Sequence, residues 1–586
     1  MRPLIQNNVA VMWAVVIVYM VIITLAGSYY SKYMRTADAY FKGSNLIPWW
    51  AAGISTYIAH FTAYTFVAIA SLVYIDGLAG LLLETGPALV YLTVAIVFAK
   101  RWHRLNLTSP PEYLEARFNP ATRQVFSILG IITSFIASGT RLYAMAKMAE
   151  SLMGLPLVWT IILMGAVMIV YTMLGGLWAV IVTDIVQFIV LFLGVVPLLV
   201  IAVAHIFMES SWAEFISRIP ANYASFPNPE HGRTLGWLLV FWFAYLLDVG
   251  GDWGTIQRMC CTPTESDARK AALLATALSV PHAFLLLGPV FIARVLWAPE
   301  IADPSVVSQA ESIYGRVAVK LLPAGMIGVV AAAMFSATMS TLGVAWNVRA
   351  TSFVNDLYVR FLRPAAGDRE QILAGRLAVL GIGGISVAIA VLVAFKSGGL
   401  FALAQDLMGL VVIPLILPLL FGLLVRRGSR WAGLAGLVVC VAFASLNKFG
   451  YALLGWSAPL PFEHEILIST ALAILVMLGT SVVHPDAESE QQIKDFFARM
   501  TRPRPVVMAD HGVPPPLGII GTFTSLIGVL FLLLVALPQG SLDRLVTFGA
   551  AVILLAFGWA MKRKHRHAEA ARQLAAQTAQ APVLAD

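Results

Sequence analysis

The feature that most constrains this chain is a series of fifteen apolar runs, each long enough to cross a lipid bilayer as a helix. They lie at about residues 9–29, 47–75, 78–99, 124–148, 156–174, 179–207, 234–250, 271–298, 321–348, 377–395, 399–425, 431–447, 465–484, 516–537 and 545–561. Hydrophobic residues make up 59% of the 586 residues and charged residues only 12%, which excludes an ordinary soluble protein. The sequence therefore predicts an all-α polytopic membrane protein with about 14–15 transmembrane helices.

Lysine and arginine gather in alternate connections between the runs, and this pattern predicts the orientation of the chain. The groups include Lys100, Arg101 and Arg104; Arg258, Arg269 and Lys270; Arg426, Arg427 and Arg430; and KRKHR from Lys562. Because basic residues stay in the cytoplasm, we expect the N-terminus outside, the C-terminus inside, and a location in the cell (inner) membrane. The net charge of +8 then reflects topology and attraction to anionic lipid, and not a nucleic-acid partner.

Several function classes lose support because their motifs do not occur. The chain contains no G-x-x-x-x-G-K-[ST], H-E-x-x-H or G-x-S-x-G pattern, and its three cysteines form no zinc spacing or disulfide framework. No connection is large enough for a typical soluble domain, and no obligate protein partner is evident. The first run lacks a basic leader and a cleavage site, so we expect it to remain in the mature protein. These features predict a protein that is not an enzyme and is driven by an ion gradient.

The segment from Ser336 to Asp356, SATMSTLGVAWNVRATSFVND, carries four hydroxyls in its first six residues. Oxygen-bearing side chains inside a membrane need a partner, and an alkali cation is one partner that hard oxygen ligands serve. The alternative is that these hydroxyls bond to a carbonyl one turn earlier or to a neighbouring helix. From the residues alone, both interpretations stand.

Two runs carry residues that favour an interrupted helix. The second run places seven polar side chains between Ser55 and Thr65, and the seventh combines acids and glycines from Asp248 to Gly254. Unwound segments free backbone carbonyls and amides to act as ligands at the membrane midplane. A short helix that ends at Gly250 explains the seventh run almost as well. The two runs lie five helices apart, as an inverted repeat of two five-helix halves requires.

Four motifs give the chain a resemblance to a known family. They are DAYFKGSNLIPWWAAGIS from Asp38, YTMLGGLWAVIVTDIVQF from Tyr171, the hydroxyl-rich SATMSTLGVAWNVRATSFVNDLY, and PLILPLLFGLLVRRGSRWAG from Pro414. Over roughly residues 9–450 the chain resembles the sodium:solute symporter family, which implies a LeuT-like five-plus-five inverted repeat with extra flanking helices. The implied division is an N-terminal helix with its inner loop (1–46), two repeats (47–207 and 234–425), additional helices (426–562) and a cytoplasmic tail (563–586).

The resemblance also implies a sodium site between the second and ninth runs. Its ligands are the backbone carbonyls of Ile58, Phe61 and Ala337 and the side-chain oxygens of Ser340 and Thr341. Asp184 matches an aspartate on the ion's exit route, near the inner end of its helix where water is within reach. Residues 343 and 344, which are serines in relatives with a second sodium, are glycine and valine here. We therefore expect one sodium ion, with Asp184 as an exit or gating residue.

The solute site is implied less completely. Glu84, Gln405 and His60 match positions that contact sugar hydroxyls in relatives, whereas Thr65 replaces a glutamine and a pocket lysine is replaced near Ala277. Carboxylate and amide groups suit a polyhydroxylated ligand because they accept and donate several directional hydrogen bonds. His60 is equally compatible with a packing role. Asp252, at the predicted break of the seventh run, completes the solute candidates.

Arg141 favours a different class of solute. Facing a cavity, its guanidinium binds a carboxylate in a bidentate manner and favours an organic acid or amino acid. Its alternative is a structural pair with Glu84 or Asp248.

The sequence thus predicts a sodium-coupled symporter that imports a small polar solute, most simply a sugar or polyol. An organic acid or amino acid is the alternative. A transporter-like membrane sensor is a further one, but the tail after Lys562 is too short for a typical signalling domain.

Overall fold

The computed structural model describes residues 9–31, 47–59, 61–105, 107, 110–174, 177–228, 231–395, 399–483, 487–502, 517–536 and 541–580. Within these ranges nearly every residue is helical, and the β pairing consists of one isolated bridge between Asn228 and Arg233. Long apolar segments satisfy their backbone hydrogen bonds internally only as helices, which is the physical reason for this architecture.

Each of the fifteen predicted runs corresponds to one helix or to consecutive helical pieces. In chain order these are α2 (Val9–Ser31); α4 (Trp49–Ala59) with η2 (Thr65–Ile69) and α5 (Ala70–Asp76); α6 (Leu78–Leu83), α7 (Gly86–Thr93), η3 (Val94–Phe98) and α8 (Ala99–Leu105); α10 (Pro120–Met153); α11 (Leu157–Leu174); α12 (Leu177–Glu209); α15 (Leu235–Gly251) with α16 (Trp253–Cys260); α17 (Glu265–Ser279) with α18 (His282–Trp297); α21 (Ala324–Ser352) with η5 (Phe353–Leu362); α22 (Asp368–Ala394); α23 (Leu400–Leu407), η6 (Met408–Val412) and α24 (Ile413–Leu424); α25 (Ala432–Phe449); α26 (Phe462–Val483); α28 (Leu517–Val535); and α29 (Ser541–Gln580).

Shorter helices occupy the connections between these elements. They are α9 (Pro110–Arg117), α13 (Trp212–Arg218), α14 (Ala221–Ala224), α19 (Val307–Ala310), α20 (Ile313–Leu321), the 3₁₀ turn η7 (Tyr451–Leu454) and α27 (Ala487–Thr501). By length and composition, ten helices of the described chain can cross a membrane, or eleven when the bent pair α15 and α16 is counted as one span. Three shorter apolar helices, at Met12–Ile22, Thr65–Asp76 and Leu157–Val170, accompany them.

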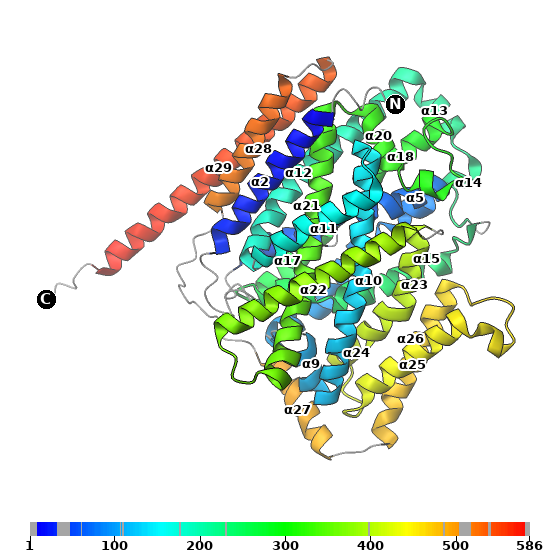
Figure 1. Ribbon diagram of the computed structural model, residues 1–586, viewed down its shortest axis with the longest axis vertical. Helices are drawn as coiled ribbons and strands as arrows, with labels where there is room; N and C mark the ends of the chain where they lie inside the picture. The colour runs from blue at the N-terminus through cyan, green and yellow to red at the C-terminus, as the bar shows by residue number, and fades with distance from the viewer. Residues whose placement is uncertain are drawn as a thin grey trace.

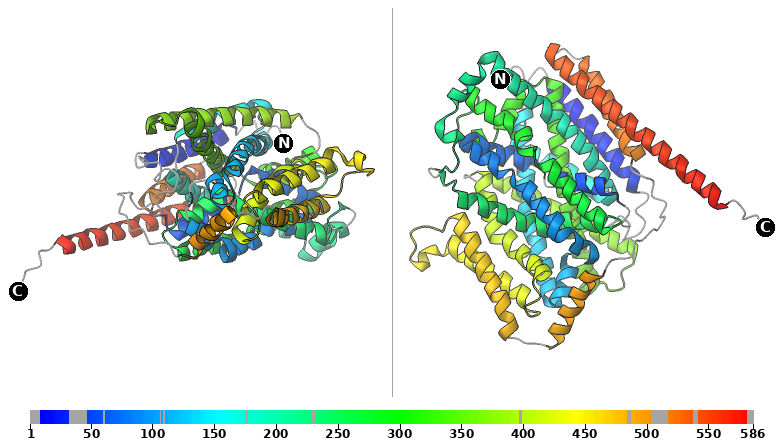
Figure 2. Two further views of the ribbon diagram at one scale, coloured as in Figure 1. Left: turned by 90° about the horizontal axis from the view of Figure 1, so that it is seen from below. Right: turned by 180° about the vertical axis from the view of Figure 1, so that it is seen from behind.

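The helices form a bundle around α21 (Figure 1). The most apolar part of α21 is 88% buried, against 28% for α22, so α21 lies at the centre and α22 at the periphery. Figure 2 shows α22 along one edge of the molecule, with the α25 and α26 pair on another side. The last two helices, α28 and α29, pack against each other and against α2 and α12, and α29 projects well beyond the bundle (Figure 1).

Both predicted interruptions are present. In the second run, α4 is described as far as Ala59, residues 61 and 62 are not helical, and the helix resumes at Ala63, followed by the π-helical turn η2. The seventh run bends by 50° between α15 and α16, at Asp252. Gly251 lies beside this bend and permits the close approach of α24, because a Cβ added to it would lie 2.3 Å from Cγ2 of Ile416.

Candidate functional site

The first break is closed by side chains of the central helix α21. Oγ1 of Thr341 lies 2.8 Å from the carbonyl oxygen of Ala59, the last residue of α4, and 3.2 Å from that of Ala337. On the other side of the break, the backbone N–H of Ala63 donates to Oγ1 of Thr338 at 2.9 Å. Helix ends leave carbonyls and amides without intrahelical partners, and here one neighbouring helix supplies a partner for both ends.

The predicted sodium ligands lie on these two facing elements. Ile58, Phe61, Ala337 and Ser340 are buried, and Thr341 is half-buried. The Ile58 carbonyl accepts a hydrogen bond from the N–H of Phe61 at 3.0 Å across the break. The ligand atoms that these residues offer to an ion are all oxygens, from carbonyls and hydroxyls, and a hard cation prefers such ligands. The ligand atoms of these residues are therefore of the type that binds a sodium ion.

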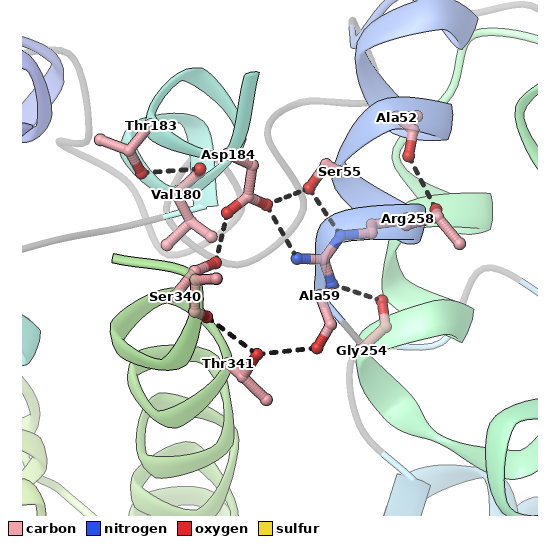
Figure 3. Close-up of polar contacts among 12 residues, drawn as sticks. Ala52, Ser55, Ala59, Val180, Thr183, Asp184, Gly254, Arg258, Ser340 and Thr341 are labelled. Atoms are coloured by element: carbon pink, nitrogen blue, oxygen red, sulfur yellow. Dashed lines mark hydrogen bonds and ion pairs between the residues drawn. The ribbon is translucent and has the colours of Figure 1, made fainter. Parts of the chain in front are cut away.

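Ser340 faces a buried carboxylate and not the break. Its hydroxyl donates to Oδ1 of Asp184 on α12, while the hydroxyl of Ser55 on α4 donates to Oδ2 (Figure 3). Arg258 of α16 reaches the same carboxylate, with one terminal nitrogen 3.2 Å from Oδ2 and its Nε donating to Ser55 at 2.7 Å. Another Arg258 nitrogen donates to the carbonyl of Gly254 at 2.9 Å. We call Ser55, Asp184, Arg258 and Ser340 the Asp184 cluster.

The Asp184 cluster corrects two expectations from the sequence. Arg258 was expected in a cytoplasmic connection, and Asp184 was expected to reach water, but the side chains of both are fully buried. The physical reason is that α16 leaves the 50° bend packed against α4, so that its last turn carries Arg258 into the bundle. A buried charge is costly unless it is paired and hydrogen-bonded, and each of these two residues compensates the other.

The second break is stabilised by a residue within the break itself. Asp252 is the N-cap of α16, and its Oδ2 accepts the backbone N–H of Thr255 at 2.9 Å. This is the usual way in which an aspartate satisfies an unpaired amide in the first turn of a helix. Asp252, predicted to contact solute, therefore has at least one structural role.

Glu84 lies at the end of α6, where it pairs with a residue that the sequence did not single out. Its Oε1 is 3.0 Å from Nε2 of His282, the first residue of α18. Nδ1 of the same imidazole is 2.6 Å from the hydroxyl of Tyr57 on α4. Tyr57 and His282 are 3% and 5% exposed, so this chain of three side chains is inside the bundle.

The other predicted solute residues lie on elements that contact one another. Thr65 begins η2, Gln405 belongs to α23 and Arg141 to α10, and these three elements pack together. Among the described residues, Arg141 forms no ion pair with Glu84 or Asp248 within 4.0 Å. His60 falls outside the described residues.

Sequence reasoning missed Arg258 and His282 for related reasons. Arg258 was counted with the basic residues of an inner connection, although it lies four residues after the glycine of a predicted break. His282 follows a proline inside the eighth apolar run, where a lone polar residue needs a partner. Both are ionisable residues within or beside apolar segments, and that feature was the available signal.

Comparison with known proteins places this geometry in a family. The model of the sodium:solute symporter family matches residues 40–440. A sodium/glucose cotransporter of Vibrio parahaemolyticus is 27% identical over 493 residues, which cover 79% of this chain and 89% of the relative. A sodium/sialic acid symporter of Aliivibrio fischeri is 27% identical over 463 residues, covering 75% of this chain and 89% of the relative.

The fold agrees with a solved structure of a Na⁺-coupled sialic acid symporter in a substrate-bound, outward-open state. The two share a TM-score of 0.67 at 22% identity, over 81% of this chain and 98% of the other, which confirms the predicted LeuT-like fold. The family is one of transporters and not of enzymes. Because the family model covers more than half of its length, the chain belongs to the sodium:solute symporter family and is a membrane-embedded, sodium-coupled carrier of a small-molecule solute.

Proposed function

We propose that this protein couples one sodium ion to the import of a neutral, polyhydroxylated solute, a sugar or a polyol. The observation that supports this most is the contact of Thr341 with the open end of α4 at the first break. There, the hydroxyl of Thr341 lies 2.8 and 3.2 Å from two backbone carbonyls, one on each of two elements. Such a set can exchange an internal hydrogen bond for a shared cation without bringing in a new charged residue.

The sodium ligands in this proposal are the carbonyls of Ile58, Phe61 and Ala337 and the hydroxyls of Ser340 and Thr341. When Ser340 turns to the ion, its hydroxyl oxygen can still keep Asp184 as the acceptor of its proton. The carboxylate of Asp184 then lies one hydroxyl away from the ion and favours a cation at this place. Arg258 already compensates that carboxylate, which supports a role for Asp184 in ion exit or gating and a stoichiometry of one sodium.

The solute class rests on polar groups that the sequence places near the two breaks or matches to solute contacts in relatives. Glu84, Gln405, Thr65 and Asp252 offer acceptors and amide or hydroxyl donors, which suit sugar hydroxyls. The sodium/glucose cotransporter among the relatives is consistent with this class. His60 remains a proposed solute contact on the basis of the resemblance alone.

A carboxylate-bearing solute is the second candidate. Arg141 supports it, because the described residues provide no carboxylate within ion-pair distance of this guanidinium. A half-buried arginine without such a partner is a typical binding group for an organic acid or amino acid. Sodium/sialic acid symporters among the relatives favour keeping this candidate.

Transport in this proposal follows alternating access. Sodium binding stabilises an outward-open state, the solute binds beside the break, and rocking of the bundle exposes both to the cytoplasm. The proposed orientation has the N-terminus outside and the basic C-terminal tail inside the cell membrane. The domain divisions given above, with repeats at 47–207 and 234–425, belong to the same proposal.

Uptake by proteoliposomes tests the coupling. An inward sodium gradient is expected to drive accumulation of D-glucose or myo-inositol, and Ser340→Ala with Thr341→Ala is expected to abolish the sodium dependence. Thr351→Ala is the matched control, since its hydroxyl bonds back to Asn347 of the same helix at 2.8 Å. Uptake that ignores sodium and follows a proton gradient would contradict the sodium assignment.

Thermal stability distinguishes the two solute classes. Ligands that bind the folded state raise its melting temperature, so sugars, polyols, amino acids and organic acids are compared in sodium and in potassium. A sodium-dependent shift with D-glucose or myo-inositol supports the first candidate. A shift only with carboxylates, lost in Arg141→Gln, supports the second.

A further inference from the structure

His282 contacts three groups, one from the helix before the first break, one from the break itself and one from the predicted solute site. Its two ring nitrogens contact Tyr57 and Glu84, at 2.6 and 3.0 Å. Its ring also packs edge-on against Phe61, with centroids 5.1 Å apart. Tyr57 lies two residues before the end of α4, and Phe61 lies within the break. The imidazole therefore connects the interrupted helix to the carboxylate of Glu84.

The contacts of His282 determine which of the three side chains donates and which accepts each hydrogen bond. Glu84 accepts through Oε1, so Nε2 of His282 carries the proton and donates it. In the neutral ring Nδ1 is then an acceptor, and the Tyr57 hydroxyl donates to it. Each group satisfies the next, and the tyrosine hydroxyl selects the tautomer that can hold the carboxylate.

The same contacts leave part of Glu84 available. Among the described residues, the bond from His282 is the only hydrogen bond that its carboxylate accepts, so Oε2 is uncommitted there. The side chain of Glu84 is 13% exposed. One oxygen of Glu84 is thus fixed by the protein, and the other can accept a bond from a ligand hydroxyl.

We propose that His282 is a positioning residue that fixes Glu84 for one particular hydroxyl of the solute and thereby sets solute specificity. This inference rests on the proposed function, because it needs a polyhydroxylated solute beside Glu84. A carboxylate that is held at one oxygen presents the other in a defined direction, and a site built to bond a hydroxyl discriminates strongly against an analogue that lacks it. A freely rotating carboxylate would accept bonds from several hydroxyls and discriminate less.

The experiment measures binding of D-glucose and its monodeoxy analogues to the full-length protein in nanodiscs, in sodium. The wild-type protein is expected to bind one analogue about 10- to 100-fold more weakly than D-glucose, the usual effect of one lost bond to a charged group. In His282→Leu this ratio is expected to fall below about threefold, and D-glucose itself to bind more weakly. Tyr57→Phe should give a smaller loss in the same direction.

Rescue and control variants separate positioning from folding. His282→Gln keeps an N–H donor for Glu84 and is expected to restore most of the discrimination. His205→Leu removes another histidine that pairs with a glutamate, Glu209 at 2.9 Å on the same helix, and should leave discrimination unchanged. Binding of radioactive sodium without sugar should stay within about twofold of wild type in every variant.

The outcomes are distinguishable. Wild-type discrimination retained in His282→Leu, or a parallel loss of sodium binding, would overturn the role of His282 while leaving the proposed function intact. Failure of the wild-type protein to bind any of these sugars in sodium would overturn the sugar class itself, and this inference with it.

Discussion

The two interrupted helices of this protein are closed by different parts of the molecule. At the first break, Thr341 and Thr338 of α21 serve the carbonyl of Ala59 and the amide of Ala63, so the partners come from a distant part of the chain. At the second, Asp252 caps the amide of Thr255 three residues later. A locally capped break keeps its shape wherever the neighbouring helices move, whereas a break closed by another helix depends on where that helix lies.

This difference assigns different tasks to the two breaks. At the first break, an ion can replace or join the hydroxyl partners from α21. The geometry of this break therefore depends on the position of α21. The second break is a bend of fixed shape between α15 and α16, which we call the elbow. The last turn of α16 places Arg258 within hydrogen-bond distance of Ser55 and Asp184. The Asp184 cluster therefore joins the elbow to the helix that precedes the first break. Four predictions test this comparison.

The largest expected effect comes from unpairing the charge that joins the two breaks. Asp184→Leu leaves Arg258 buried without its carboxylate, and removal of one partner of a buried pair costs about 3–5 kcal/mol. We expect a steep fall in the melting temperature of the protein in nanodiscs. Adding Arg258→Met removes the orphaned charge and should recover part of the loss. A double variant that is less stable than the single one would show that the pair is not the source of the effect.

Thr341→Ala tests the first break. It removes a proposed ligand, and we expect the apparent affinity for sodium to fall about 10- to 100-fold, as measured by sodium-dependent uptake. Thr338→Ala instead leaves the amide of Ala63 unsatisfied and should cost about 1–3 kcal/mol of stability with little change in sodium affinity. Equal effects of the two variants on sodium affinity would remove the distinction between ligand and structural hydroxyl.

Asp252→Ala tests the second break. The loss of an N-cap costs about 1 kcal/mol, so we expect a modest fall in melting temperature and an unchanged apparent affinity for sodium. Asp252→Asn keeps an acceptor for the Thr255 amide and should retain most of the stability. If Asp252→Ala reduced sodium affinity as strongly as Thr341→Ala does, the second break would not be a fixed elbow.

The smallest effect concerns a charge cluster outside both breaks. Glu115 on α9 accepts hydrogen bonds from Arg123 at 2.5 Å and from Arg360 at 3.2 Å. Partial burial opposes ionisation, but these hydrogen bonds prevail and lower the pKa of Glu115. Its contribution to stability is therefore complete above the pKa of the unfolded chain, about 4.3, and is lost as the pH falls through the lower folded pKa.

The melting temperature measured against pH checks this. Glu115→Gln should be less stable than the wild-type protein near neutral pH, and the difference should shrink in acid. The same titration of sodium affinity should show no effect of this variant. A change in sodium affinity would mean that this cluster acts on the first break.

Much of the fold and part of the site could be predicted from the sequence. A bilayer requires long apolar helices, and this requirement is written into local composition, so all fifteen runs were found. The hydroxyls of Ser340 and Thr341 and the two breaks were also visible, since polar groups and glycines are exceptional in such runs. The partners were not visible, because Ser340 meets a carboxylate 156 residues away.

The sequence by itself determined that the chain is a polytopic helical membrane protein with two interrupted helices, because hydropathy and helix-breaking residues act over short distances. Only the tertiary structure decided that Arg258 turns inward to Asp184, that α21 closes the first break, and that His282 connects Tyr57 with Glu84. These contacts depend on the order in which the helices pack, and a buried polar group specifies that it needs a partner without specifying which one.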